Sequence, residues 1–157
     1  MRRQVLMAVT LLLAATEAFA QGQKPDFSGE RVLNRQASTL SQAMAGVQSG
    51  TLRIEHHEPN VSVRLTLVMN GQPFDTVVDR TTDGHEVANT QQGRSTTSSF
   101  RWDGEALRFA ARAQGPNCDG TVTIRYELED NGRRIRATEA IRGCGRDQDN
   151  IWVFERP

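Results

Sequence analysis

Apolar and polar residues alternate over most of the chain from Thr51 onward. The apolar members of the clearest stretches are Leu52 and Ile54, then Val61, Val63, Leu65 and Leu67, then Leu107, Phe109, Ala111 and Ala113, then Val122, Ile124, Tyr126 and Leu128. Successive side chains of a β-strand point to opposite faces of a sheet, so this period of two is typical of strands with one buried and one solvated face. The sequence therefore predicts an all-β, antiparallel protein.

Turn residues separate these stretches at steady intervals. The turn positions are Pro59-Asn60, Asn70-Gly71, Asp83-Gly84, Gly93, Asp103-Gly104, 116–120, Asn131-Gly132 and 143–150. Asn-Gly and Asp-Gly suit tight hairpins because both central residues need positive φ. Together with three weaker segments at 74–80, 85–90 and 95–102, they predict about ten strands in a meander with no room for crossover helices.

An open sheet of about ten strands exposes unpaired backbone groups at its two edge strands, where other chains can pair and aggregate. Closing the sheet into a barrel removes these edges. We therefore expect an up-and-down barrel of about 8–10 strands, with a β-sandwich as the alternative. Successive turns of a meander alternate between the two ends. The turns near 60, 84, 104 and 132 then share one end, and those near 71, 93, 118 and 146 share the other, which has the longest loops and is the expected mouth.

One segment between the first two strands has a helical period. Thr39-Leu40-Ser41-Gln42 matches a capping box, in which hydroxyl and amide satisfy backbone donors. Leu40, Met44 and Val47 follow at helical spacing. This predicts a short helix of two to three turns that places Leu40, Met44 and Val47 over the mouth as a partial lid.

The first twenty residues have the composition of an export signal. Arg2 and Arg3 precede an apolar run over 5–15, and Ala18-Phe19-Ala20 fits a small-x-small cleavage site. The run is short for a bilayer span, and no later segment resembles a transmembrane helix. We expect a signal peptide over 1–20 and one exported domain over 21–157.

Lys24 is the only lysine beside eighteen arginines, which we interpret as the codon bias of a GC-rich bacterial genome. The compartment would then be periplasmic or extracellular. Removing Arg2, Arg3 and Glu17 with the signal changes 19 basic and 19 acidic residues to 17 and 18. A near-neutral chain gives no reason to expect nucleic acid or a charged membrane surface as partner.

The N-terminal motif and the order of elements resemble the lipocalin-like (calycin) barrels. The chain is similar to small, uncharacterised exported bacterial proteins that open Asp-Phe-Ser-Gly-x-Trp. The matching stretches are Asp26-Phe27-Ser28-Gly29, Ile54-Glu55-His56-His57-Glu58-Pro59, Thr82-Asp83-Gly84 and Trp102-Asp103-Gly104-Glu105-Ala106-Leu107. The resemblance covers most of the mature chain and implies a barrel that binds small apolar ligands.

One departure from the motif concerns its tryptophan. The residues Gly29-Glu30-Arg31 stand where the motif has Gly-x-Trp, so the tryptophan that plugs the closed end of lipocalins is absent, and no family site residue carries over. We expect Trp102 to cap that end instead.

Cys118 and Cys144 are the only two cysteines of the chain, which we expect to be exported. Both fall in loops at the same predicted barrel end, two strands apart, which favours a disulfide over a metal site or a nucleophile. His56 and His57 are adjacent on a strand and point to opposite faces, and His85 follows a turn, so they do not converge as metal ligands. We expect three independent surface or rim histidines, no metal and no cofactor.

Several carboxylates, Glu55, Glu58, Asp79 and Glu139, have the chemistry for acid–base work, but their spacing singles out no pair. Serines at 95, 98 and 99 match no catalytic pattern. We therefore expect a binding protein and not an enzyme.

Arginines follow one another on consecutive predicted strands, and most of them fall on the face opposite the apolar rows. They are Arg108, Arg112, Arg125, Arg134, Arg136 and Arg142. Acidic residues among them favour an ion-paired outer wall. The alternative is a docking surface for anionic lipid headgroups or an acidic partner protein.

A barrel of about ten strands is wider than side chains alone usually fill. The residues expected to line a cavity are Leu65, Leu67, Phe74, Leu107, Phe109, Ile124 and Tyr126. The first hypothesis is an exported lipocalin-like protein that binds a small apolar or amphipathic ligand inside the barrel. The alternative is a cell-envelope interaction module, such as an inhibitor or accessory subunit, with a packed core and no ligand.

Overall fold

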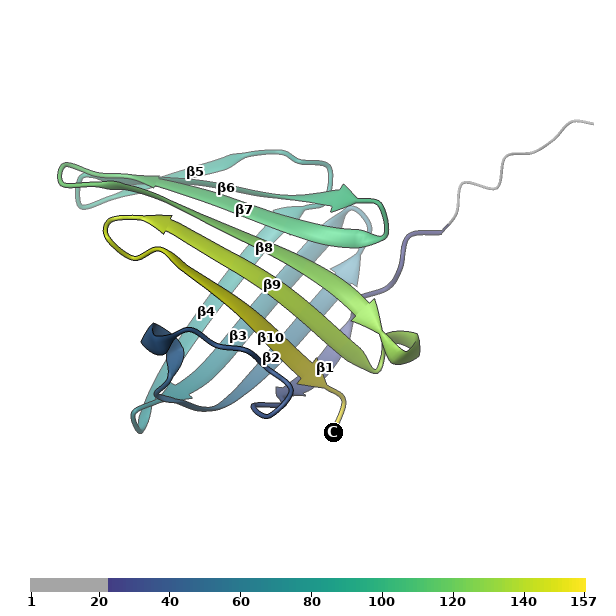
Figure 1. The fold of residues 1–157 in the computed structure, drawn as a ribbon. Helices are drawn as coiled ribbons and strands as arrows, with labels where there is room; N and C mark the ends of the chain where they lie inside the picture. The colour runs from purple at the N-terminus through teal and green to yellow at the C-terminus, as the bar shows by residue number, and fades with distance from the viewer. Residues whose placement is uncertain (1–22) are drawn as a thin grey trace, which may run out of the picture.

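The computed structural model describes residues 23–157, so the predicted signal peptide and its cleavage site lie outside the described residues. Ten strands follow one another along the chain, with two single-turn 3-10 helices between them (Figure 1). The strands are β1 Gly29–Leu33, β2 Val47–His57, β3 Asn60–Met69, β4 Gln72–Thr81, β5 Val87–Gln91, β6 Arg94–Asp103, β7 Ala106–Gln114, β8 Asp119–Glu129, β9 Arg134–Gly143 and β10 Gln148–Glu155. The 3-10 helices are η1 Gln42–Met44 and η2 Asp130–Gly132.

The strands form one antiparallel sheet that curls into a nearly closed barrel. Its order is β4-β3-β2-β1-β10-β9-β8-β7-β6-β5, because β1 pairs with β10 and links the first half of the meander to the second. Strands β4 and β5 do not pair. The gap between them is bridged near one end, where the Arg80 guanidinium donates to Ser98 Oγ at 2.7 Å and Asp83 pairs with Arg101. The predicted up-and-down barrel is confirmed.

The predicted turns join the observed strands. Asn70 and Gly71 between β3 and β4 have φ of 51° and 75°, as a tight hairpin requires.

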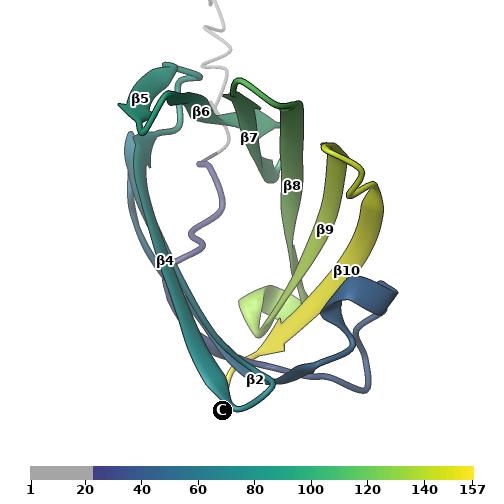
Figure 2. The same ribbon diagram turned by 90° about the vertical axis from the view of Figure 1, so that its left-hand side faces the viewer.

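The segment before β1 crosses the barrel end that carries the β2–β3, β4–β5, β6–β7 and β8–β9 turns, which we call the sealed end. The other end, with the β7–β8 and β9–β10 loops, is the mouth. Figure 2 looks into the barrel from the mouth.

The predicted two-to-three-turn helix is wrong in length: η1 is a three-residue 3-10 turn without a side-chain cap. The segment before it finds its backbone partners on β10 instead. Thr39 and Ile151 exchange N–H···O bonds of 2.8 and 2.7 Å, and the Ser41 hydroxyl donates to Gln148 at 2.7 Å. Val47 begins β2 and belongs to the core, whereas Leu40 and Met44 pack against the core from the loop.

Candidate functional site

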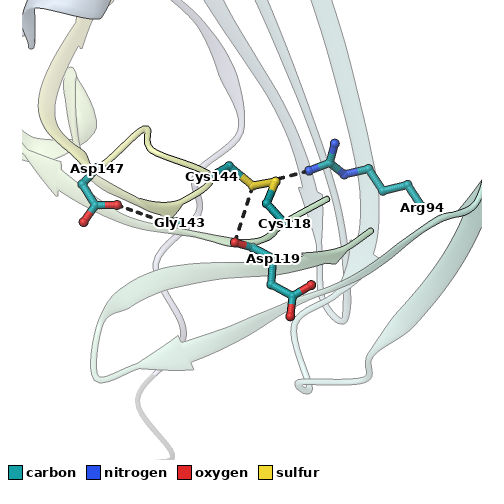
Figure 3. Close-up of a disulfide and its surroundings, with 6 residues drawn as sticks. All are labelled: Arg94, Cys118, Asp119, Gly143, Cys144 and Asp147. Atoms are coloured by element: carbon teal, nitrogen blue, oxygen red, sulfur yellow. Dashed lines mark hydrogen bonds between the residues drawn. A yellow bond between two sulfur atoms is a disulfide. The ribbon is translucent and has the colours of Figure 1, made fainter. Parts of the chain in front are cut away.

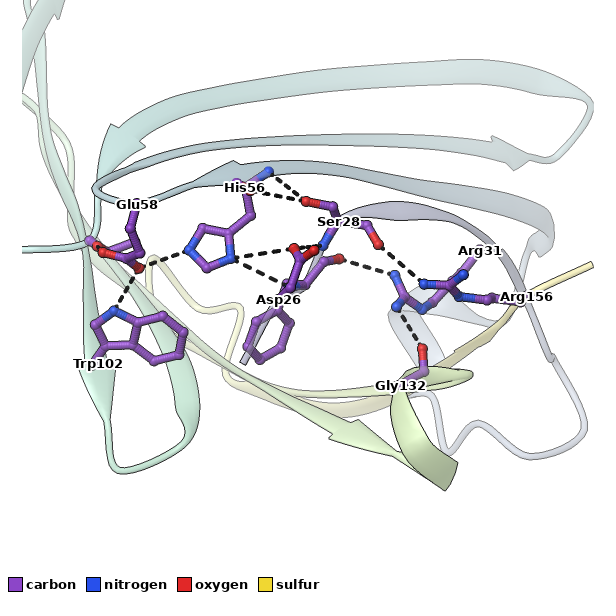
Figure 4. A network of polar contacts seen from close by, with 10 residues as sticks. Asp26, Ser28, Arg31, His56, Glu58, Trp102, Gly132 and Arg156 are labelled. Atoms are coloured by element: carbon purple, nitrogen blue, oxygen red, sulfur yellow. Dashed lines mark hydrogen bonds and ion pairs between the residues drawn. The ribbon is translucent and has the colours of Figure 1, made fainter. Parts of the chain in front are cut away.

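The sealed end is closed by a small polar and aromatic cluster of Phe27, His56, Glu58, Thr82 and Trp102. Figure 4 shows the His56 and Trp102 side chains pointing toward Glu58. The Phe27 ring is fully buried, with its centroid 6.0 Å from Trp102 and 6.3 Å from His56. Glu58 accepts hydrogen bonds from His56 Nε2 at 2.8 Å, Trp102 Nε1 at 2.9 Å and Thr82 Oγ1 at 2.7 Å. Burial raises the pKa of Glu58, but the hydrogen bonds from Thr82, His56 and Trp102 outweigh it and lower the pKa.

The expectation that all three histidines lie at the surface or rim is wrong for His56, which is buried while His57 and His85 are exposed. The Phe27 amide lies 3.4 Å from His56 Nδ1, which fits a proton on Nε2 facing Glu58. The burial of His56 could have been predicted from the strand alternation, since His56 lies on the same face of β2 as the buried Leu52 and Ile54.

Arg31 stands where the resembling proteins have tryptophan, and it is fully buried. Its Nη1 donates to the Phe27 carbonyl at 3.1 Å and its Nη2 to the Gly132 carbonyl at 2.7 Å, so it ties the N-terminal segment to the β8–β9 turn (Figure 4). Burial and the neighbouring Arg156 lower the pKa of Arg31. A charged anchor therefore shares the sealing of this end with Trp102.

The mouth is fastened by the predicted disulfide, which is confirmed. Cys118 and Cys144 join the β7–β8 and β9–β10 loops with Cα atoms 5.3 Å apart (Figure 3). The Asp147 carboxylate accepts from the Gly143 amide at 2.8 Å, which shapes the same loop. Arg94 of β6 reaches this rim, with Nη2 at 3.9 Å from Cys144 Sγ.

The seven residues expected to line a cavity all have inward parity in the strand register, but they divide into two groups. Leu67, Leu107 and Tyr126 are buried in the core. Leu65, Phe109 and Ile124 are half-buried, and Phe74 is 53% exposed. Core side chains therefore fill only part of the barrel, and several inward side chains, such as Leu65, Phe109 and Ile124, remain partly exposed.

Small residues open the mouth half of the barrel. A pocket of about 230 Å³ lies against Ala111, Ala113, Val122 and Ile141 of β7, β8 and β9, and three arginines, Arg94, Arg142 and Arg146, also line it. A second pocket of about 390 Å³ adjoins it between the β5–β6 and β7–β8 connections. Its lining is rich in side-chain amides and is made by Asn89, Gln91, Gln92, Arg94, Thr96, Gly115, Pro116, Asn117 and Cys118. The mouth thus offers an apolar wall beside a polar one.

Glu139 of β9 faces the interior and is half-buried. Its Oε2 accepts hydrogen bonds from Asn150 Nδ2 at 2.8 Å and from Trp152 Nε1 at 2.9 Å. The structure does not bring it together with Glu58, which belongs to the sealed end, or with Glu55 and Asp79 on the outer face. Sequence spacing did not single out Glu139. Its position on the same face of β9 as the buried Ile135 and Ala137 could have indicated that it faces the interior.

Four of the six predicted outer-wall arginines form ion pairs, as the first interpretation of this row expected. The pairs are Arg125–Asp103 at 3.1 Å, Arg134–Glu155 at 2.8 Å, Arg136–Glu129 at 2.7 Å and Arg142–Asp149 at 2.6 Å. Within residues 23–157, no cluster of three or more histidine, cysteine or acidic side chains has the arrangement of a metal site. Over the same residues, no helix has the length and apolar character needed to cross a membrane.

No protein-family model and no curated protein matches this chain in sequence. Solved structures match its fold. A secretory abundant heat soluble (SAHS) protein of Ramazzottius varieornatus is 10% identical over 82% of this chain and 94% of that chain, with a TM-score of 0.54. A point mutant of the fluorescent protein UnaG is 16% identical over 83% and 96%, with a TM-score of 0.52. A fatty acid-binding protein from Drosophila melanogaster brain is 18% identical over 83% and 100%, with a TM-score of 0.49.

Sequence identities this low support a likeness in fold alone. The SAHS protein and the UnaG mutant, each with a TM-score above 0.5, support that likeness. They share with this chain an architecture in which a meander of antiparallel strands curls around one interior. The chain therefore has the fold of the calycin-like β-barrels.

Proposed function

We propose that the chain is an exported binding protein that takes a small apolar or amphipathic ligand into the mouth half of its barrel. The observation that carries this proposal is the contrast between the two ends. Phe27 and Arg31 are fully buried at the sealed end, whereas Ala111, Val122 and Ile141, which face inward toward the mouth, are only half-buried. Accessible apolar surface inside a concave site is typical of small-molecule binding.

The amphipathic character follows from the two adjoining pockets. The apolar wall formed by Ala111, Val122 and Ile141 borders a pocket lined by amide side chains and Arg94. A ligand with an apolar body and a polar group can contact both walls at once. Leu40 and Met44, which pack beside the core from the η1 segment, remain the proposed lid.

Export is supported by the disulfide, because such bonds persist in oxidising compartments. The alternative of an interaction module with a packed core is less well supported. It requires a filled interior, and the half-buried inward side chains of β3, β7 and β8 are unlike such a core. That the chain is not an enzyme stays a prediction.

Filling the proposed site provides the test. Ala111→Trp places a large side chain in the 230 Å³ pocket, and Ala110→Trp places the same side chain on the opposite face of β7. Titration with the neutral fluorescent probe N-phenyl-1-naphthylamine should show saturable binding to the wild type. We expect Ala111→Trp to weaken it at least about tenfold, roughly 1.4 kcal/mol, and Ala110→Trp to change it little.

Thermal unfolding of both variants checks that each barrel is folded. Equal weakening by the two substitutions would place the probe outside the barrel, and a wild type without saturable binding would contradict the proposal.

A further inference from the structure

Among the paired strand residues of the described chain, Glu139 is the one acidic side chain on the inward face of the sheet. Glu58 lies beyond the end of β2, in the cluster at the sealed end. The inward arginines and histidine lie elsewhere. Arg31 and His56 belong to the sealed end, Arg80 binds Ser98 across the gap between β4 and β5, and Arg94 lies at the rim.

The carboxylate of Glu139 is only partly satisfied by the protein. Asn150 and Trp152 both donate to Oε2, and within the described residues Oε1 has no protein donor and no arginine, lysine or histidine nitrogen lies within 4.0 Å of either oxygen. An ionised carboxylate offers about four acceptor positions. Glu139 is half-buried on the inward face, so part of its side chain remains exposed to solvent.

Aromatic side chains lie next to this carboxylate. The register places Phe109, Ile124, Glu139 and Asn150 in one row across β7 to β10, and Leu107, Tyr126, Ala137 and Trp152 in the next row toward the sealed end. Diagonal neighbours in such rows are within reach of long side chains. Burial raises the pKa of Tyr126, and the charge of Glu139 raises it further, which agrees with their closeness.

A carboxylate oxygen and aromatic faces are both favourable partners for a cation. The inward positions of the two strands beside β9 supply no positive side chain that could serve as that partner. They are Gly120, Val122, Ile124, Tyr126 and Leu128 on β8, and Gln148, Asn150, Trp152 and Phe154 on β10. Arg94, Arg142 and Arg146 line the neighbouring pocket, but none of them pairs with Glu139. The neighbouring strands therefore leave Glu139 without a positive partner.

We propose that Glu139 binds the protonated amine of an amphipathic ligand whose apolar part lies against Ala111, Val122 and Ile141. This assignment rests on the proposed function, because it requires a ligand inside the barrel. Asn150 and Trp152 orient the carboxylate by holding Oε2, and Oε1 accepts from the ammonium group. The chain thereby selects amines over alcohols and carboxylates of the same length.

The test compares three probes with one chain length, namely decylammonium, decanol and decanoate, each titrated calorimetrically at pH 7 and below its micelle concentration. The wild type should bind decylammonium at least about tenfold more tightly than decanol. Glu139→Gln keeps the size and an acceptor oxygen for Asn150 and Trp152 but removes the charge. It should lower the affinity for decylammonium about tenfold and leave decanol within about twofold. Glu127→Gln, on the outward face of β8, removes a charge outside the barrel and should change neither.

Equal affinity of the wild type for decylammonium and decanol, or tighter binding of decanoate, would overturn the role of Glu139 while leaving the binding barrel in place. The same holds if Glu139→Gln weakens all three probes alike, since that indicates a structural role. If none of the probes binds the wild type, the proposed function fails with it.

Discussion

Replacing Phe27 by alanine is expected to destabilise the barrel by about 3–5 kcal/mol, the range for removing a buried aromatic ring from a core. Phe27 is 0% exposed and contacts the rings of Trp102 and His56. Its truncation leaves a cavity at the sealed end, where the Phe27 backbone also accepts a hydrogen bond from Arg31 and donates one to His56. Unfolding in urea, followed by tryptophan fluorescence, measures the loss.

Phe74→Ala is the matched control, because it removes the same ring from a position that is 53% exposed. We expect it to cost less than about 1 kcal/mol, as for most surface substitutions. Because Phe74 has inward parity on β4, this variant should affect ligand binding more than stability. A similar loss of stability in both variants would mean that Phe27 does not close the core.

Removing the disulfide is expected to cost about 3 kcal/mol. Cys118 and Cys144 are 26 residues apart, and closing a loop of that length restricts the unfolded chain by about this amount in the chain-entropy account. The double variant Cys118→Ser/Cys144→Ser removes the bond and leaves two small hydroxyls at the rim, away from the sealed end. Chemical unfolding with and without the substitutions measures the difference.

A reductant supplies the control for this prediction. Dithiothreitol should lower the unfolding free energy of the wild type toward that of the double variant and leave the double variant unchanged. If oxidised and reduced wild type unfold at the same urea concentration, the bond adds no stability to the fold.

The strand pattern predicted most of the fold because period two and the turn residues are local signals. Asn70-Gly71 and Asp103-Gly104 mark their turns by residue type alone, and the alternation of turns between the two barrel ends predicts that Cys118 and Cys144 share one end. The helix expected after Thr39 was predicted to be too long, because the backbone of this segment pairs with Ile151, more than a hundred residues later. The local sequence pattern carries no information on such a distant partner.

The sequence predicts which residues of the candidate site face the barrel interior, but not how deeply each of them is buried. Parity assigns Leu107 and Phe109 to the same inward face, yet one is buried and the other half-buried, because burial depends on which barrel end the N-terminal segment closes. The burial of Arg31 could not be predicted from the sequence either. Its burial depends on the Phe27 and Gly132 carbonyls, which the fold brings together from distant parts of the chain.

The most direct test of a binding site inside the barrel is a methyl NMR titration of protein labelled at alanine, valine and isoleucine, with decanol as the probe. The account predicts saturable shifts at Ala111, Val122 and Ile141, which face the interior, and little change at Ala110 and Ala140, which face outward on the same strands. Shifts confined to the outward alanines, or no saturable shift at any of the inward methyl groups, would contradict it.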